Sequence, residues 1–241
     1  MQTLYSGVED ASFLIDFRRN ISAGGQPAIE TLCQLLLLGE VSFQDVEQSS
    51  AVLGTIVTGQ TTEAVEAVFN SLVNPQAVEP VAAAIKVSAI QQSIGMTCSP
   101  GLYVHNLAAI ANGTVTGDTD DLEAAASSAL GAFASKQPCP FTEPHLTLGS
   151  HHIVELLTNK TIDAQHNETI LKGLYGMANS RHANLIDGAI PFFNHSDPSV
   201  RVAAIRAIAN VPTVRQLRHY VTTRDTNAVR IAQPAILFII F

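Results

Sequence analysis

The sequence predicts an all-α protein built as an α-α superhelix, that is, a HEAT-like solenoid of antiparallel helix pairs. Hydrophobic residues make up 46% of the 241 residues and charged residues 14%, which is typical of a globular chain and not of a disordered one. Apolar residues recur at spacings of three and four, and runs of alternating β-branched residues are scarce. A short helical motif also occurs twice near the carboxyl end.

About a dozen amphipathic segments, separated by turns, are expected to form helices. In order they are Ala11–Arg19, Ala28–Leu38, a helix capped by Ser42, Thr62–Leu72, Gln76–Ile94, Leu102–Asn112, Asp120–Ser135, Leu146–Thr158, Ala164–Met177, Leu185–Phe193 and the helix within His195–Asn210. The turn Ser22–Pro27 separates the first two helices, and the three prolines of Lys136–Pro144 exclude a continuous helix there.

Two of these helices have a clear predicted buried face. In Thr62–Leu72 that face consists of Ala64, Val65, Val68, Phe69 and Leu72. In Gln76–Ile94 it consists of Val78, Val81, Ala82, Ile85 and Ala89. Faces of this kind pack against neighbouring helices.

The segment His195–Asn210 is expected to be one helix of a stacked repeat. Pro198 suits a first helical turn, and Asp197 before it can cap the free amide groups. The apolar stripe of this helix contains Val200, Ala203, Ala204, Ala207 and Ile208. Because three of these five residues are alanine, a neighbouring helix can approach closely. Arg201 and Arg206 fall outside the stripe.

A second copy of this motif follows twenty-nine residues later, where Asn227–Ala232 (NAVRIA) matches PSVRVA. Val229 and Arg230 then correspond to Val200 and Arg201 and complete the predicted repeat core. Helix pairs that recur at roughly 30–47 residues are typical of HEAT and armadillo solenoids. The pattern therefore favours a stacked helical repeat over a catalytic loop.

Charge is unevenly distributed along the chain. The net charge is −8, yet residues 181–241 contain seven Arg against three Asp. A basic end could meet an anionic partner such as nucleic acid or lipid headgroups. We favour the alternative that arginines at matching repeat positions tie neighbouring repeats together. No nucleic-acid partner is therefore expected.

Several features indicate the secretory pathway. N-x-S/T triplets begin at five positions, Asn20, Asn112, Asn159, Asn167 and Asn194. Of the three cysteines, Cys98 and Cys139 could form a disulfide, or all three could be free thiols with Cys33 buried in a helix.

Met1–Ser12 lacks the pattern of a signal peptide, and no stretch approaches the roughly 20 apolar residues of a membrane span.

Candidate catalytic and metal-binding residues are few. His151 and Glu155 lie four residues apart and near His145 and His152, so two ligands could share a helix face. The H-E-x-x-H order is absent, however, and the sequence fixes no third ligand. We therefore expect no metal site, no cofactor and no enzymatic activity.

The order of the motifs resembles the helical domain of the large lipid transfer proteins, the family of vitellogenin, apolipophorin, apolipoprotein B and microsomal triglyceride transfer protein. The resemblance rests on the leucine-rich Ala28–Glu47, the LGTIVTGQTTEAVEAVFNSLVN of Leu53–Asn74, the CSPGLYVHNLAA of Cys98–Ala109, the ILKGLYGM of Ile170–Met177 and the two VR-x-A repeats. It covers nearly the whole chain. The amino-terminal β-barrel of that family and its lipid-lining β-sheets have no counterpart here.

The resemblance implies a secreted, glycosylated scaffold that acts in lipid transport without being an enzyme. Residues 1–241 would form a single solenoid domain, with an incomplete last repeat, in a larger protein. Its partners would be the other domains of that protein and, through their β-sheets, lipid. The alternative is a general HEAT-repeat scaffold that binds other proteins along a concave face.

Overall fold

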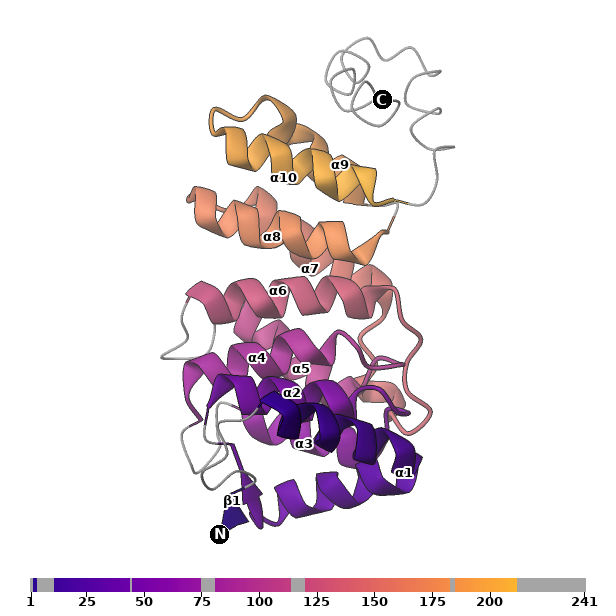
Figure 1. Ribbon diagram of the computed structural model, residues 1–241. Coiled ribbons are helices and arrows are strands. Elements are labelled where there is room, and N and C mark those ends of the chain that lie inside the picture. The colour runs from indigo at the N-terminus through magenta and orange to yellow at the C-terminus, as the bar shows by residue number, and fades with distance from the viewer. Residues whose placement is uncertain are drawn as a thin grey trace. The chain divides into compact units, whose positions relative to one another are not determined.

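The computed structural model describes residues 2–3, 11–43, 45–74, 81–113, 120–182 and 185–211 (Figure 1). Its helix content of 74% confirms the predicted all-α class. The described α-helices are α1 (Ala11–Leu37), α2 (Val46–Ile56), α3 (Glu63–Val73), α4 (Ala83–Ser93), α5 (Gly101–Ala111), α6 (Asp120–Ala134), α7 (Ser150–Ile162), α8 (Asn167–Ser180), α9 (Leu185–Ala189) and α10 (Pro198–Ala209). Two 3₁₀ helices, η1 (Pro144–Leu146) and η2 (Ile190–Asn194), lie between them. Two two-residue strands, β1 (Gln2–Thr3) and β2 (Val41–Ser42), pair in parallel.

The chain divides into two compact units, whereas the sequence predicted a single domain. The first unit contains residues 1–129 and 136–148, and the second contains residues 130–135 and 149–241. Helix α6 contributes to both, because its first ten residues belong to the first unit and its last five to the second. This boundary has no sequence signature, since it falls within a continuous alanine-rich helix.

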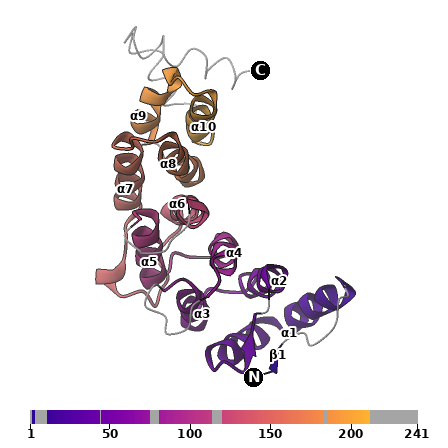
Figure 2. The ribbon, with the colours of Figure 1, turned by 90° about the vertical axis from the view of Figure 1, so that its left-hand side faces the viewer.

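In the first unit, alternate helices are neighbours. Helix α1 contacts α2 and α3, α2 contacts α4, and α3 contacts both α4 and α5. Figure 2 shows α2 beside α4 and α3 beside α5. Contacts between helix n and helix n+2 are the local pattern of stacked helix pairs, in which each repeat rests on the next.

The second unit has the same local pattern. Helix α7 contacts α8 and α9, and α10 contacts α8 and α9. Successive helices therefore pack in pairs, and alternate helices pack side by side, in this unit as well. Its core includes Leu157, Leu174 and Met177, each with 0% of its surface exposed.

Helix boundaries follow the capping chemistry more closely than the predicted periodicity. The expected break between the first two helices is a kink inside α1, where Gly25 adopts φ 63° and ψ −156°, a conformation that requires glycine. The predicted Ser42 cap is wrong, because Asp45 is the cap of α2 and its carboxylate accepts a hydrogen bond from Gln48 N at 2.8 Å. Helices α7 and α8 begin at Ser150 and Asn167, four and three residues later than predicted.

The predicted buried faces of α3 and α4 are partly wrong. In α3, Val65, Val68 and Phe69 are buried as expected, but Val73 is buried in place of Leu72. In α4, Ala89 alone is buried among the described residues of the predicted stripe, and its companions are Ser88, Ile90 and Ser93. The helix begins at Ala83, so Val81 and Ala82 precede it. Val78 lies outside the described residues.

Candidate functional site

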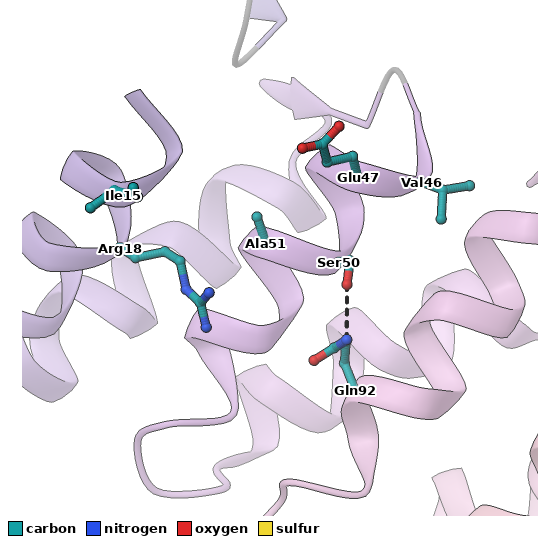
Figure 3. A pocket seen from close by; sticks show the side chains of 7 residues that line it. All are labelled: Ile15, Arg18, Val46, Glu47, Ser50, Ala51 and Gln92. Carbon is teal, nitrogen blue, oxygen red and sulfur yellow. Dashed lines mark hydrogen bonds between the residues drawn. The ribbon is translucent and has the colours of Figure 1, made fainter. Parts of the chain in front are cut away.

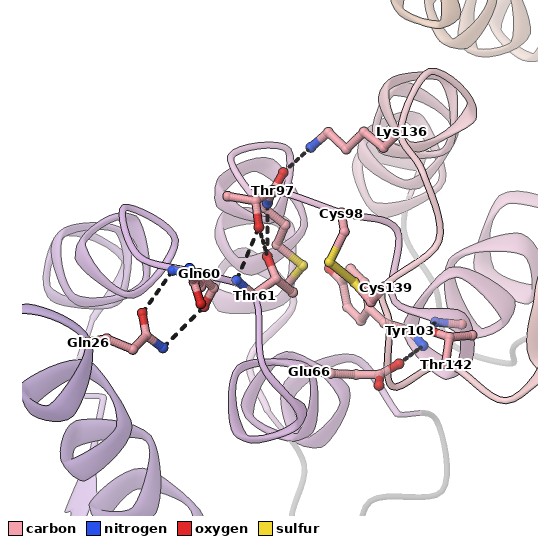
Figure 4. The surroundings of a disulfide bond; sticks show 12 residues. Gln26, Gln60, Thr61, Glu66, Thr97, Cys98, Tyr103, Lys136, Cys139 and Thr142 are labelled. Atoms are coloured by element: carbon pink, nitrogen blue, oxygen red, sulfur yellow. Dashed lines mark hydrogen bonds between the residues drawn. A yellow bond between two sulfur atoms is a disulfide. The ribbon is translucent and has the colours of Figure 1, made fainter.

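The first unit is linked at one set of helix ends by reciprocal hydrogen bonds (Figure 4). Gln60 N donates to Gln26 Oε1 at 2.8 Å, and Gln26 Nε2 donates to Gln60 O at 3.3 Å. Thr97 N donates to Thr61 Oγ1 at 2.8 Å, and Thr61 N donates to Thr97 Oγ1 at 3.2 Å. Gln26 lies just after the kink of α1, whereas Gln60, Thr61 and Thr97 lie in the connections between helices, and each pair is more than thirty residues apart.

A disulfide between Cys98 and Cys139 continues these links (Figure 4). The sequence left this pairing open, and the structure joins the two residues with a Cα–Cα distance of 5.0 Å. Backbone hydrogen bonds from Ser99 N to Gln137 O (2.8 Å) and from Cys139 N to Ser99 O (3.0 Å) flank it. Closing a loop across 41 residues stabilises a fold by about 4 kcal/mol in the chain-entropy estimate.

Near the disulfide, two charged side chains form hydrogen bonds with backbone groups at the ends of helices. The Lys136 ammonium donates to the carbonyl oxygens of Ile94 (2.5 Å) and Met96 (2.6 Å) just after α4, and burial lowers the pKa of this lysine to about 8. The Glu66 carboxylate accepts from Tyr103 N at 3.0 Å in the first turn of α5. Burial raises the pKa of Glu66, although hydrogen bonds from backbone amides oppose that shift. Both groups therefore act as caps supplied by a neighbouring element.

The third cysteine, Cys33, is a core residue of α1. None of its surface is exposed. Burial raises the pKa of its thiol to about 11, with a further contribution from the nearby charge of Glu30. The group is therefore a thiol at neutral pH and has no thiolate character to support nucleophilic chemistry.

The predicted apolar stripe of the helix within His195–Asn210 is buried. Val200, Ala203, Ala204, Ala207 and Ile208 are all buried in α10. As predicted, Pro198 begins the helix and the Asp197 carboxylate caps it, accepting from Ser199 N at 2.8 Å.

The described hydrogen bonds of Arg201 are local, and whether the arginines tie neighbouring repeats together stays a prediction. The Arg201 guanidinium donates to His195 O (2.7 Å) and Ser196 O (2.9 Å), so its described hydrogen bonds hold the turn before its own helix. Val229 and Arg230, together with the rest of the second copy and the apolar carboxyl end, lie outside the described residues.

The five predicted glycosylation asparagines share one property. Asn20, Asn112, Asn159, Asn167 and Asn194 are all exposed. The other described asparagines differ, since Asn70, Asn74, Asn106 and Asn179 are half-buried and only Asn210 is exposed. The acceptor nitrogens of the N-x-S/T triplets therefore lie on the surface, where a glycan can be accommodated.

The histidine cluster does not form a metal centre within the described ranges. His151, His152 and Glu155 are exposed on α7, while His145 contacts Glu143 at 3.3 Å. No three metal-ligating side chains converge among the described residues. Over the same residues, no helix has both the length and the apolar character needed to cross a bilayer.

A pocket of about 630 Å³ opens on the first unit between α1, α2 and α4 (Figure 3). Its lining residues are Ile15, Arg18, Val46, Glu47, Ser50, Ala51 and Gln92. Ile15 and Val46 are 64% and 43% exposed, which is high for large apolar side chains. The Arg18 guanidinium reaches toward α2. One of its nitrogens lies 3.9 Å from the position that a Cβ added to Gly54 would take.

The polar side of this pocket is formed by α2 and α4. Gln92 Nε2 donates to Ser50 Oγ at 2.9 Å across the two helices. The same glutamine lies against Gly54, where an added Cβ would come within 2.9 Å of Gln92 Oε1. The sequence does not indicate this site, because its residues come from three separate helices and their spacing in the chain contains no motif.

A second pocket on the first unit has a similar volume, about 640 Å³, and a different chemistry. Glu30 and Glu63 line it together with Leu37 and Phe141. No lysine, arginine or histidine is among its lining residues. The two pockets therefore differ in the charge that they present.

No protein-family model matches this sequence, and no curated protein matches it.

Proposed function

We propose that this chain is a non-enzymatic helical-repeat scaffold that acts in lipid transport, as the helical domain of a large lipid transfer protein. Its task would be to support a lipid-holding sheet contributed by other parts of that protein. The order of sequence motifs from Ala28 to Ala232 suggests the family, and the structure contributes evidence on the repeat architecture.

The spacing of the hydrogen bonds between helices is the observation that carries this proposal. In the first unit, Gln26–Gln60, Thr61–Thr97 and Asn70–Asn106 are 34, 36 and 36 residues apart. In the second unit, Asn167–Asp197 and Ala178–Asn210 are 30 and 32 residues apart. Other hydrogen bonds between described helices span up to 42 residues, as from Gln92 to Ser50. Separations of 30 to 42 residues are compatible with one helix pair of a solenoid, and this supports the proposal.

Two further observations support the proposed location in the secretory pathway. Disulfides such as Cys98–Cys139 persist in oxidising compartments and are rare where thiols are kept reduced. The exposure of all five triplet asparagines is compatible with glycosylation of the folded chain.

A general scaffold for protein partners is the second candidate. Tyr175 on α8 and Val202 on α10 are 43% and 48% exposed on two helices that contact each other. Exposed apolar side chains on adjacent helices are a common feature of protein-binding surfaces. This candidate needs neither lipid nor flanking β-structure.

Determination of the complete transcript would separate the two candidates. The lipid-transport proposal expects sequence rich in amphipathic strands on both sides of residues 1–241. The protein expressed from that transcript, purified from culture medium, should release lipid into organic solvent in many molar equivalents. A transcript without strand-rich flanks, or a full-length product without bulk lipid, would contradict lipid transport and favour the protein-binding scaffold.

A further inference from the structure

We propose that the pocket between α1, α2 and α4 binds the head group of a zwitterionic, single-chain phospholipid, with the phosphate at Arg18 and the ammonium group at Glu47. This inference deepens the proposed function, because it assigns a lipid class to the helical scaffold itself. It concerns one molecule per chain and does not require the β-sheets of a lipid cavity.

Two opposite charges face this pocket without a partner among the described residues. Neither Arg18 nor Glu47 has an ion pair or side-chain hydrogen bond there, although they line the same pocket (Figure 3). The neighbouring Arg19 differs, because its guanidinium pairs with Asp16 and it does not line the pocket. A ligand that carries both charges, a short distance apart, would neutralise both side chains at once.

Hydrogen-bond donors in the pocket suit a phosphate. The Arg18 guanidinium supplies several donors in a planar arrangement that matches phosphate oxygens. Ser50 Oγ accepts from Gln92 Nε2, so the Ser50 hydroxyl hydrogen is free to point to a ligand. The Gln92 amide has a second hydrogen as well. Together these groups can surround one phosphate from three helices.

The apolar residues of the pocket indicate that the ligand is an amphiphile and not a free head group. Ile15 and Val46 are among the most exposed large apolar side chains of the first unit, and both line this pocket with Ala51. Covering them with an acyl chain would remove apolar surface from water, which is favourable. A soluble phosphocholine would leave these side chains exposed.

The two charges favour a zwitterion over amphiphiles with a single charge. A fatty acid would pair with Arg18 alone and leave the exposed Glu47 carboxylate to water. A cationic amphiphile would meet the opposite problem at Arg18. The second pocket, lined by Glu30 and Glu63 and by no cation, has no group for a phosphate. The two-charge ligand therefore fits the pocket that contains Arg18.

The test uses the full chain and lysophosphatidylcholine below its micelle concentration, titrated by calorimetry. We expect saturable binding of one molecule per chain, and weakening by about tenfold or more in both Arg18→Gln and Glu47→Gln. Arg19→Gln is the matched control and should bind as the parent does. Lysophosphatidylglycerol lacks the ammonium group. Its affinity for the Glu47→Gln variant should therefore equal or exceed its affinity for the parent chain.

Three results would overturn the proposal. They are no binding to the parent chain, equal binding by all three variants, or binding of free phosphocholine as tight as that of the lysolipid. Circular dichroism would establish that the variants are folded, which is expected because both side chains are exposed. The two proposals can fail separately. If the chain binds the lysolipid but the transcript has no strand-rich flanks, the lipid-transport proposal is refuted and the head-group site is retained.

Discussion

The two units of the molecule have similar helix contacts, but the disulfide lies in the first unit and the two closest glycine crossings lie in the second. In the first unit, helix ends are joined by the Cys98–Cys139 disulfide and by the Gln26–Gln60 and Thr61–Thr97 pairs. In the second unit, glycines inside helices allow close approach. A Cβ added to Gly131 of α6 would overlap the backbone carbonyl of Gly176 in α8, and one on Gly173 would overlap Thr161 Oγ1.

This difference shows that packed helices can be linked at their ends or along their faces. A Cβ added to a glycine can meet either a flexible side chain or the backbone of a neighbouring helix. In the first unit, for example, Gly54 of α2 meets the flexible ends of the Gln92 and Arg18 side chains and no backbone. Close crossings require small residues at fixed positions and tolerate little change in volume. The units should therefore respond to different perturbations.

The largest effect is expected from Ala204→Asp in the second unit. Ala204 has 0% of its surface exposed on the buried face of α10, so the substitution would bury an unpaired carboxylate. The expected loss is about 3–5 kcal/mol of unfolding free energy. Chemical denaturation would measure it. Arg206→Ala, on the exposed face of the same helix, should change the free energy by less than about 0.5 kcal/mol, and equal losses in the two variants would contradict the assignment of the faces.

Removal of the disulfide should have the next largest effect, in the first unit. The double variant Cys98→Ser/Cys139→Ser should lose about 2–4 kcal/mol of unfolding free energy, because the unfolded chain gains the entropy of an open loop. A reducing agent should lower the melting temperature of the parent protein and have no further effect on the double variant. If the reducing agent leaves the parent unchanged, the disulfide does not stabilise this unit.

A smaller loss is expected from Gly131→Ala, which tests the close crossing in the second unit. The added methyl group would meet backbone atoms of Gly176, so α6 and α8 would have to separate, at a cost of about 1–3 kcal/mol. Gly149→Ala is the control, because a Cβ at Gly149 has no atom within 4 Å. Thermal unfolding of both variants would measure the difference, and a Gly131→Ala protein as stable as the control would show that the crossing is not restrictive.

The smallest effect concerns Glu66, which caps α5 in the first unit. Because burial raises its pKa above the ordinary 4.5, the folded chain binds this proton more tightly than the unfolded chain does. The ionised carboxylate therefore reduces stability above the folded pKa, and protonation removes this penalty as the pH falls toward 4.5. Glu66→Gln should change stability at pH 7 by less than about 1 kcal/mol and flatten the stability profile just above pH 4.5. If Glu66→Gln leaves the pH dependence of the unfolding free energy unchanged, the ionised Glu66 carboxylate does not reduce stability.

The sequence predicted those parts of the fold that depend on local chemistry. The stripe from Val200 to Ile208 was complete because a proline start and an acidic cap fixed where α10 begins. The interruption at Gly25 followed from residues that disfavour a continuous helix. The cap of α2 was misplaced because Ser42 and Asp45 can both cap a helix, and only the tertiary structure selects between them.

The candidate site depends on contacts that local patterns do not contain. Nothing in the spacing of three cysteines indicates that Cys98 and Cys139 lie 5.0 Å apart at their Cα atoms. In the same way, Arg18 and Glu47 line one pocket only because α1 contacts α2. The buried face of α4 was also misassigned, because it includes the polar residue Ser88. The Ser88 hydroxyl accepts a hydrogen bond from Ser49 Oγ at 3.4 Å, which a hydrophobic pattern does not predict.

Hydrogen exchange measured by mass spectrometry, on the oxidised and the reduced protein, would test the central claim most directly. If links at helix ends hold the first unit and close crossings hold the second, reduction should increase exchange in α4 and α5 beside the disulfide and leave α8 and α10 unchanged. An equal increase in both units, or no increase in α4 and α5, would contradict this account of how the two units are stabilised.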